Sequence, residues 1–480
     1  MKQESEHFQE KAHEALVNPT LQQNLNLLQQ VLPAVRDNAM EQLGQFEELR
    51  SHVKSVRDHT LENLDHYLRQ YEEQVVLHGG HVHWAKDAAE MNDIVLQLCK
   101  RHDAKTVGKG KSMITEETAL SEHLENAGLE VTETDLGEYI IQIAEEPPSH
   151  IVGPAMHKTV DEIRELLFEK HDLGERDLPD PPAMVQEARR ILRERFLNTD
   201  IGIIGANALI AENGTNMLVT NEGNGDLVSS LPKVQIVCAS VEKVLPRPED
   251  ATALLRLLAR SAIATPVSAY TSFYSGPRRE EDSDGPEEFH VVLLDNGRSD
   301  IIGSNYQDML GCMRCGACLN HCPVYMAAGG HSYGWVYPGP MGSVLTPLLT
   351  GLENSNVLPN ACTACGRCAE VCPADIPLPD LLRDLRTEEH DLKLSPASWR
   401  RGLKLHGWIA RLPRFYHLLT SIVFRCMHLL GRRKGYLRGL GVKNGWTEVR
   451  DFPAPEGGTF MGQWKKHQKN KDSGSESFTD

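Results

Sequence analysis

The chain has 480 residues, more than a single hydrophobic core usually supports, so its length predicts two or three domains. Apolar residues make up 40% of the chain and charged residues 24%, close to the values of folded domains, which excludes a chain that is disordered throughout. The 50 basic and 67 acidic residues give a net charge of −17, which would repel polyphosphate and disfavours nucleic acid as a partner.

The sequence shows no signal for secretion or membrane insertion. The first 30 residues are rich in Gln, Glu and His and contain neither an apolar stretch nor a small-residue cleavage site. No window reaches about 18 uninterrupted apolar residues, so no transmembrane helix is expected. We therefore expect a cytoplasmic protein.

Residues 1–75 are expected to form a helical region. Apolar residues recur at three- and four-residue spacing from Thr20 to Gln74, as Leu21, Leu25 and Leu28 illustrate. This spacing is typical of paired amphipathic helices that bury one face.

Residues 76–300 are expected to form an α/β domain, because short β-branched runs alternate with helical stretches. Such alternation predicts βαβ units around a mainly parallel sheet. The expected strands are 75–77, 105–107, 129–132, 201–204, 234–239 and 291–294, and the expected helices are 88–100 and 116–127. The stretch 208–220 alternates around Asn213-Gly214, which favours a hairpin with a type I′ turn. The Pro-, Gly- and acid-rich stretch 276–288 predicts an exposed loop.

Eight of the eleven cysteines form two runs of identical spacing within residues 301–390. In each run, two residues separate the first three cysteines, and the fourth follows after three residues and precedes a proline. The runs are Cys312, Cys315, Cys318 and Cys322 before Pro323, and Cys362, Cys365, Cys368 and Cys372 before Pro373. In two-cluster ferredoxins the first three cysteines of such a run ligate one [4Fe-4S] cluster and the fourth ligates the other. The spacing therefore assigns Cys312, Cys315, Cys318 and Cys372 to cluster 1, and Cys362, Cys365, Cys368 and Cys322 to cluster 2.

Crossed ligation of this kind would hold the two clusters close enough for electron transfer. The small residues Gly316, Ala317, Ala364 and Gly366 would let each loop bend, so that backbone N–H groups donate to the sulfurs. The alternative is a pair of structural zinc sites, but zinc modules rarely combine three equally spaced cysteines with a Cys-Pro ending. The long segment between the runs, 323–361, leaves room for helices around the clusters.

The other three cysteines are Cys99, Cys238 and Cys426. None has a cysteine or histidine partner at metal-binding spacing, so we expect them to pack as small apolar residues.

Several stretches resemble the lactate utilization protein B family, the iron–sulfur subunits of a three-protein L-lactate oxidation system. They are GGHVHWAKDAAEMNDIV (79–95), GKSMITEE (110–117), TDLGEYIIQIA (134–144), PSHIVGPAMHKT (148–159), AENGTNMLVTNEGNGDL (211–227) and GCMRCGACLNHCPVY (311–325). The resemblance covers nearly the whole chain. It implies an α/β domain of the sugar isomerase and CoA-transferase-like superfold, followed by a two-cluster ferredoxin domain similar to those of succinate dehydrogenase and heterodisulfide reductase subunits.

The resemblance also implies a role and partners. The role is electron transfer from the oxidation of lactate to pyruvate, through two [4Fe-4S] clusters, toward a quinone or another carrier. The implied partners are a cysteine-rich subunit of the heterodisulfide reductase type and a second subunit with a lactate-utilization domain.

The chemistry of the α/β domain itself stays open. Gly202-x-x-Gly205 lacks the spacing of a dinucleotide fingerprint, so NAD and FAD are not expected. Glu212, before Asn213-Gly214, resembles the nucleophilic glutamate of CoA transferases. Hairpin geometry alone explains Asn-Gly and is the favoured explanation, because no second CoA-binding glycine motif is visible. The alternative function is therefore an organic-acid or CoA-ester enzyme that uses Glu212. No catalytic acid–base pair is predicted.

Two further groups of polar residues have simpler explanations. Lys111, Ser112 and Thr115 precede a predicted helix and could bind a carboxylate or phosphate, but capping by the Thr115 hydroxyl is the simpler role. Single histidines are more often hydrogen-bonded structural residues than ligands. The histidines to which this applies are His81, His83, His150 and His157.

Residues 391–480 are expected to form a basic helical region with a disordered polar tail, SGSESFTD. Between Arg400 and Lys443 there are eleven Lys or Arg residues and no Asp or Glu. The apolar run 415–430 could lie along anionic lipid headgroups, with Arg425 opposing a membrane span. The alternative is a helix docked on an acidic partner subunit or on the acidic domain of this chain.

Overall fold

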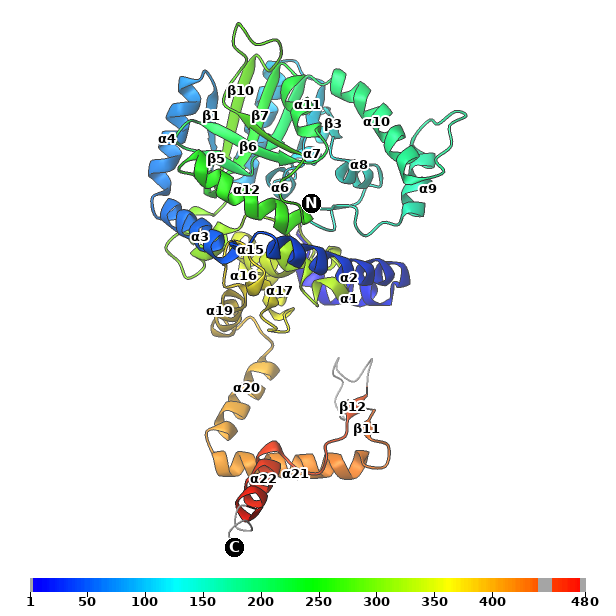
Figure 1. Cartoon of the computed structure of the whole chain (residues 1–480), viewed down its shortest axis with the longest axis vertical. Helices are drawn as coiled ribbons and strands as arrows, with labels where there is room; N and C mark the ends of the chain where they lie inside the picture. Colours follow the sequence, from blue (N-terminus) through cyan, green and yellow to red (C-terminus); the bar gives the residue numbers. More distant parts are fainter. Residues whose placement is uncertain (1–2, 439–450, 475–480) are drawn as a thin grey trace. The chain divides into compact units, whose positions relative to one another are not determined.

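A computed structural model describes residues 3–438 and 451–474 and divides the chain into two compact units, residues 1–391 and 392–480 (Figure 1). Each unit is described by itself. In the described ranges no helix has the length and apolar character needed to cross a membrane.

The larger unit begins with helices, as the apolar spacing predicts. They are α1 (Phe8–Val17), α2 (Pro19–Glu41), α3 (Phe46–Glu62) and α4 (Leu64–Leu77), after a short turn, η1 (Ser5–His7). The predicted strand 75–77 is wrong, because these residues end α4. Leu64, Leu68, Tyr71 and Val75 recur at helical spacing and form the buried face of α4, so their β-branched neighbours do not change the conformation.

The next region contains a six-stranded parallel sheet in the order β1-β10-β7-β4-β2-β3, which confirms the predicted α/β class. The strands are β1 (His81–Ala85), β2 (Thr106–Lys109), β3 (Glu130–Glu133), β4 (Ile201–Gly205), β7 (Val234–Ser240) and β10 (Glu288–Leu294). Strand β1 was not predicted; it is an edge strand whose polar and aromatic residues remain partly exposed. The helices of this region are α5 (Ala88–Arg101), α6 (Met113–Glu117), α7 (Leu120–Asn126), α8 (Leu136–Ile143), α9 (Val160–Lys170), α10 (Pro181–Leu197), α11 (Asn224–Ser230) and α12 (Pro248–Ile263).

Two apolar cores cover the two faces of the sheet. On one face Met91, Val95 and Leu98 of α5 and residues of α7 pack against alternate residues of the central strands. On the other face α4 packs against the intervening residues, such as Val237 and Val291. The alternation of strand residues between the two cores gives a three-layer helix–sheet–helix arrangement.

A second, four-stranded sheet has the order β8-β5-β6-β9. Its strands are β5 (Ala208–Ile210), β6 (Thr215–Thr220), β8 (Val244–Leu245) and β9 (Tyr270–Tyr274). The predicted hairpin exists, since Ile210 pairs with Thr215, but the loop has four residues and only Gly214 has a positive φ, +64°. The predicted type I′ turn is therefore wrong, because that turn needs positive φ at two consecutive residues.

The cysteine runs lie in a helical region after β10. Its elements are η3 (Ser299–Ile301), η4 (Gln307–Gly311), α13 (Ala317–Asn320), α14 (Tyr325–Ala328), η5 (His331–Tyr333), α15 (Gly339–Thr350), α16 (Leu352–Ser355), α17 (Val357–Asn360), α18 (Arg367–Glu370) and α19 (Leu378–Asp391). The segment between the runs thus contains helices, as expected.

The N-terminal helices join the α/β region to the cysteine runs. Helices α1 and α2 contact α14, and α2 and α3 contact α12. Three arginines donate to backbone carbonyls near the cysteines: Arg36 to Val371 O at 2.7 Å, Arg50 to Ala369 O at 2.8 Å and Arg57 to Leu310 O at 2.8 Å. These bonds tie the N-terminal helices to the loops that carry the cysteines.

The smaller unit contains α20 (Ala397–Ala410), α21 (Pro413–Gly431), a two-stranded ladder of β11 (Tyr436–Leu437) and β12 (Phe452–Pro453), and α22 (Phe460–Gly474). Many large apolar side chains of α20 and α21 are exposed, among them Trp408 (58%), Leu418 (60%) and Ile422 (49%). Lys443 lies outside the described residues. Of the tail SGSESFTD, the part after Gly474 also lies outside them.

Candidate iron–sulfur site and adjoining cavity

The two cysteine runs fold into the same backbone shape. The second residue after the first cysteine has a left-handed φ in both runs, +60° at Arg314 and +56° at Ala364, although neither is glycine. Gly316 and Gly366 follow at φ +76° and +80°, and each is the N-cap residue of a four-residue helix, α13 or α18. Left-handed non-glycine residues are strained and persist where the surrounding structure requires them.

The structure gathers the eight cysteines into two sets of four. Three cysteines of the first run and the last of the second line one small cavity, here called the cluster-1 cavity: Cys312, Cys315, Cys318 and Cys372. The remaining four line the other, the cluster-2 cavity: Cys362, Cys365, Cys368 and Cys322. Four thiols around one cavity form a soft donor set, which suits iron–sulfur or zinc ligation and does not suit Mg²⁺ or Ca²⁺.

Backbone N–H groups point at the sulfurs. Arg314 N donates to Cys312 Sγ at 3.4 Å, and the corresponding Ala364 N donates to Cys362 Sγ at 3.3 Å. Ile376 N donates to Cys372 Sγ at 3.4 Å. Such bonds stabilise negative charge on sulfur, so the left-handed residues place donors where a thiolate–iron centre would use them.

The two cavities differ in their exposure to solvent. All four cysteines of the cluster-1 cavity are buried. In the cluster-2 cavity Cys365 is exposed, and Cys322 and Cys362 are partly exposed. Cluster 2 would therefore lie nearer the surface than cluster 1.

Burial opposes free thiolates at these positions. It raises the pKa of Cys315 and Cys368 to about 12 and that of Cys372 to about 11, with neighbouring cysteines adding to the shifts. Thiolates at these positions need a cationic centre to stabilise them, and bound iron supplies that charge.

A buried ion network connects the α/β region to the first cysteine run. Arg298 pairs with Glu117 at 2.6 Å and with Glu242 at 3.0 Å, and all three side chains are fully buried. Arg314 lies 3.5 Å from Glu242 and over the ring of Tyr337, whose hydroxyl donates to Glu117 at 2.6 Å. The arginines outweigh the cost of burial and lower the pKa of Glu242 to about 2. The network therefore stays charged and fixes the loop beside Cys312.

A second cavity, here called the sheet-end cavity, adjoins the cluster-1 cavity. It has a volume of about 280 Å³ and lies where β2, β4 and β7 end. Polar side chains on its wall include Lys111, Ser112, Ser240, Lys243, Arg314 and Tyr337. Ile151, Met313 and Arg314 line both cavities, so a ligand in the sheet-end cavity would be separated from cluster 1 by single side chains.

The predicted cap at Thr115 is wrong. Helix α6 begins at Met113, and Thr115 is a buried residue whose hydroxyl donates to Ser112 O at 2.8 Å and accepts from Lys109 Nζ at 3.1 Å. Lys111 and Ser112 do face the sheet-end cavity. Gly205 allows this arrangement, because a Cβ there would lie 2.7 Å from Ser112 Oγ.

The other candidates from the sequence lie apart from both cluster cavities. Glu212 is exposed on the β5–β6 loop and does not line the sheet-end cavity. Cys99 and Cys238 are buried in the core, as predicted, whereas Cys426 is exposed on α21, so its predicted packing is wrong for this chain alone. It lies on an apolar helix face that no described residue covers.

Two of the four histidines are hydrogen-bonded structural residues, as predicted. His150 Nε2 donates to Asn320 Oδ1 at 3.1 Å, while His150 Nδ1 accepts from Val152 N at 3.0 Å. His157 contacts Glu146 and Ser149, both at 2.8 Å.

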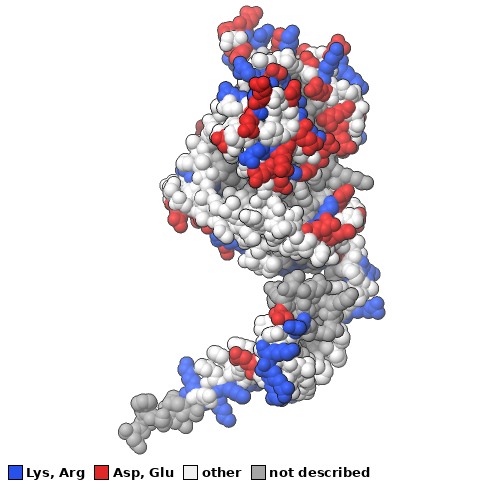
Figure 2. Space-filling view, turned by 90° about the vertical axis from the view of Figure 1, so that its right-hand side faces the viewer, with Lys and Arg blue, Asp and Glu red and all other residues white. Residues whose placement is uncertain are grey.

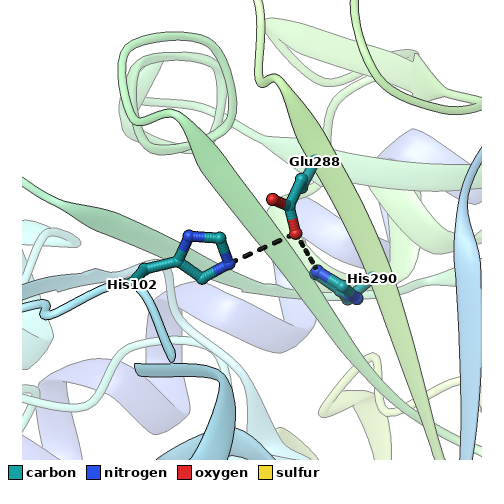
Figure 3. A group of neighbouring side chains, drawn as sticks. All are labelled: His102, Glu288 and His290. Atoms are coloured by element: carbon teal, nitrogen blue, oxygen red, sulfur yellow. Dashed lines mark hydrogen bonds and ion pairs between the residues drawn. The ribbon is translucent and has the colours of Figure 1, made fainter. Parts of the chain in front are cut away.

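The other two histidines, His81 and His83, contact a group of side chains at the opposite end of the sheet. Figure 3 shows the group itself, His102, Glu288 and His290. His102 and His290 each lie 3.2 Å from Glu288, His83 lies 3.1 Å from His290, and His81 stacks on His290. His102, Glu288 and His290 could together ligate a divalent metal. Without a metal, the same contacts are hydrogen bonds in which the Glu288 carboxylate accepts from the two imidazoles.

A cluster of carboxylates around Lys109 needs no metal. Lys109 Nζ is fully buried and lies 2.7 Å from Glu116, 3.0 Å from Glu133 and 4.0 Å from Glu138. The ammonium group occupies the position that a cation would take. One ammonium cannot balance three carboxylates. Burial raises the pKa of Glu133 to about 7 and holds the pKa of Glu138 well above its ordinary range, so protonation of these carboxyls reduces the remaining negative charge.

Comparisons with known proteins match both parts of the chain. The LUD domain family matches residues 68–294, and the 4Fe-4S dicluster domain family matches residues 308–376. The chain is similar to the lactate utilization protein B of Geobacillus sp. (strain WCH70), with 43% identity over 472 residues, covering 98% of this chain and 99% of the relative. It is also similar to that of Bacillus velezensis, with 42% identity over 467 residues, covering 97% and 98%.

One solved structure also matches. It is described as a DUF162 family protein from Deinococcus radiodurans, with 12% identity, covering 48% of this chain and 98% of its own. The TM-score of 0.25 is too low to establish a shared arrangement.

Proposed function

The chain belongs to the lactate utilization protein B family and acts in lactate utilization and iron–sulfur electron transfer, and we propose that it relays electrons through two [4Fe-4S] clusters. The grouping of the cysteines carries the proposal. Each cavity combines three cysteines of one run with the fourth of the other, which is the crossed pattern of two-cluster ferredoxins.

In this proposal Cys312, Cys315, Cys318 and Cys372 hold cluster 1, and Cys362, Cys365, Cys368 and Cys322 hold cluster 2. When bound, the clusters supply one-electron redox chemistry. The chain's own contribution is to fix the thiols, to direct N–H groups at the sulfurs and to exclude water from cluster 1. The exposure of Cys365 favours cluster 2 as the point of electron exchange with a partner, on the way to a quinone or another carrier.

The proposed partners are a cysteine-rich subunit of the heterodisulfide reductase type and a second subunit with a lactate-utilization domain. The described part of the smaller unit supports a docking role. Its helix α21 exposes Phe415, Leu418 and Ile422 on one face, and Lys and Arg side chains are spread along this unit (Figure 2). Apolar and basic groups together suit an acidic partner surface.

We also propose a cytoplasmic location. In this setting reducing conditions keep the eight thiols available for iron. Contact of α21 with the inner face of the membrane is the alternative to docking on a partner, and both would cover the same apolar face.

Metal analysis and EPR test the proposal. Protein purified anaerobically should contain about eight irons and about eight acid-labile sulfides per chain. After full reduction, the EPR spectrum should show two magnetically interacting clusters, because crossed ligation keeps them adjacent. About four irons per chain, zinc in place of iron, or two clusters without magnetic interaction would contradict it.

A further inference from the structure

We infer that the sheet-end cavity binds a small carboxylate anion directly beside cluster 1. The site rests on the geometry of the cavity. The choice of a 2-hydroxy or 2-oxo acid, such as L-lactate or pyruvate, as its ligand rests additionally on the proposed function.

The position of the cavity is the first argument. From β2 the chain passes to β3 at one edge of the sheet, whereas from β4 it passes to β7 on the other side. Strands β2 and β4 are neighbours, so the direction of winding reverses between them. At such a switch point the loops after adjacent strands diverge and leave a crevice at their carboxyl ends, where parallel sheets bind ligands. The sheet-end cavity lies in this crevice.

Lys243 is the second argument. It follows β7 in η2 (Val241–Lys243), lines the cavity and is 7% exposed. Among the described residues its ammonium group has no hydrogen-bond or ion-pair partner. The adjacent Glu242 is occupied by Arg298 and Arg314. Buried ammonium groups are normally paired, so Lys243 is available to an anion in the cavity.

The remaining wall defines the size and charge of the ligand. Lys111 and Arg314 add two cations; Lys111 also donates to Val152 O, and Arg314 pairs with Glu242. Two carboxylates line the cavity as well, but both accept backbone hydrogen bonds: Asp135 from Glu138 N at 3.1 Å and Glu222 from Leu136 N at 3.0 Å. Because Arg314 is balanced by Glu242, the unpartnered ammonium of Lys243 is the group that favours a ligand with a single negative charge.

The volume and the apolar part of the lining favour a short acid. A cavity of about 280 Å³ lies below the usual range for drug-sized ligands. Leu258, Ala262 and Ile263 of α12 contribute apolar surface that could contact a methyl group. A dinucleotide would not fit, in agreement with the missing fingerprint at Gly202 and Gly205.

A competing role for Lys243 is to balance the negative charge of cluster 1, because Cys312 acts on it electrostatically. The two roles make different predictions. A charge-balancing lysine affects the cluster potential whether or not an anion is present. A ligand-binding lysine affects the affinity for the anion.

The test uses the full-length protein with its clusters, purified anaerobically, and titrates it with pyruvate, L-lactate and inorganic phosphate by calorimetry. Pyruvate or L-lactate should bind saturably, and Lys243→Gln should weaken that binding at least about tenfold, the loss of one charge-assisted bond. Lys233→Gln, an exposed lysine before β7, is the matched control and should bind as the unmodified chain does. Iron content and EPR spectra of both variants establish that the clusters are intact.

Three results would overturn the inference. They are no saturable binding of either acid, equal binding by Lys243→Gln and the unmodified chain, or phosphate that displaces the acids with equal affinity, which would assign the cavity to inorganic anions. A shift of the cluster-1 potential in Lys243→Gln with unchanged affinity would assign the lysine to charge balance. None of these results affects the proposed electron relay, which metal content and EPR test separately.

Discussion

The fourth cysteine of each run is the residue on which the cluster assignment depends. The short gaps keep the first three cysteines of a run near each other in any fold. Cys322 and Cys372, however, could ligate the cluster held by either run. The structure places Cys372 with Cys312, Cys315 and Cys318. This placement gives a testable difference between crossed and uncrossed ligation.

Cys315→Ser and Cys372→Ser should remove the same cluster, although they lie in different runs. Each variant should lose about four irons and leave the same residual EPR spectrum, that of cluster 2. Cys365→Ser and Cys322→Ser should leave the other spectrum, that of cluster 1. Cys426→Ser, at an exposed cysteine outside the runs, should keep the full iron content. A Cys372→Ser spectrum that matches Cys365→Ser would contradict crossed ligation.

Glu212→Gln tests the alternative function. If Glu212 were a nucleophile, the amide would abolish activity, with a loss of several orders of magnitude. Because Glu212 is exposed and does not line the sheet-end cavity, we expect lactate oxidation by the assembled three-subunit system to change less than about twofold. A large loss with intact clusters would instead establish chemistry at this loop.

The residues of the site could be predicted only in part. The spacing of the cysteines identifies them as ligands, because iron–sulfur ligation requires short fixed gaps. Lys243 and Glu242 gave no such signal. A Glu-Lys pair after a strand usually lies in solvent, and only the packed structure shows that both are buried. Thr115 was misassigned because the helix starts three residues earlier than its capping pattern indicates.

At the scale of elements, the two cluster loops share a backbone but not their surroundings. Gly316 and Gly366 occupy equivalent positions with left-handed φ, so alanine at either is strained by about 1 kcal/mol. A Cβ at Gly316 would also lie 3.2 Å from His150 and Val152, whereas one at Gly366 would meet nothing within 4 Å.

Gly316→Ala should therefore destabilise the protein more than Gly366→Ala. We expect the free energy of unfolding to fall by about 2 kcal/mol in the first variant and about 1 kcal/mol in the second. The urea concentration at which half of the cluster absorbance is lost shows which variant is less stable. Equal midpoints would show that the contact with His150 relaxes without cost.

The element predictions failed where local and tertiary signals conflict. Val75, Val76 and Leu77 have strand propensity, but the spacing of Val75 from Leu68 and Tyr71 continues the buried face of α4. Val76 and Leu77 are exposed at the end of the same helix. Strand β1, by contrast, contains the polar residues His81 and His83 beside Trp84. It forms a strand because it pairs with β10. Strand pairing between residues 209 positions apart cannot be deduced from either segment alone.

At the scale of the whole molecule, the predicted domain bounds 1–75, 76–300, 301–390 and 391–480 remain predictions. Residues 1–391 form one compact unit, in which the N-terminal helices contact both the α/β region and the cysteine runs. The buried network of Arg298, Glu117 and Glu242 also holds the α/β region and the first cysteine run together. The sequence gives no sign of it, because its members are 56 to 181 residues apart.

The smaller unit should be required for assembly but not for cluster binding. Leu418→Glu with Ile422→Glu places two charges on the exposed apolar face of α21 and should weaken co-purification with the partner subunits at least about tenfold, while the iron content stays unchanged. Gln468→Glu, on exposed α22, is the control. Unchanged co-purification together with lost sedimentation on anionic vesicles would assign the face to the membrane.

We propose that this chain relays electrons from lactate oxidation and is not itself the subunit that oxidises lactate. EPR of the anaerobic protein after addition of L-lactate, with and without the two partner subunits, tests it most directly. We expect EPR to show reduced clusters only when the partner subunits are present. Reduction by lactate with this chain alone would contradict it and would place the catalytic site within these 480 residues.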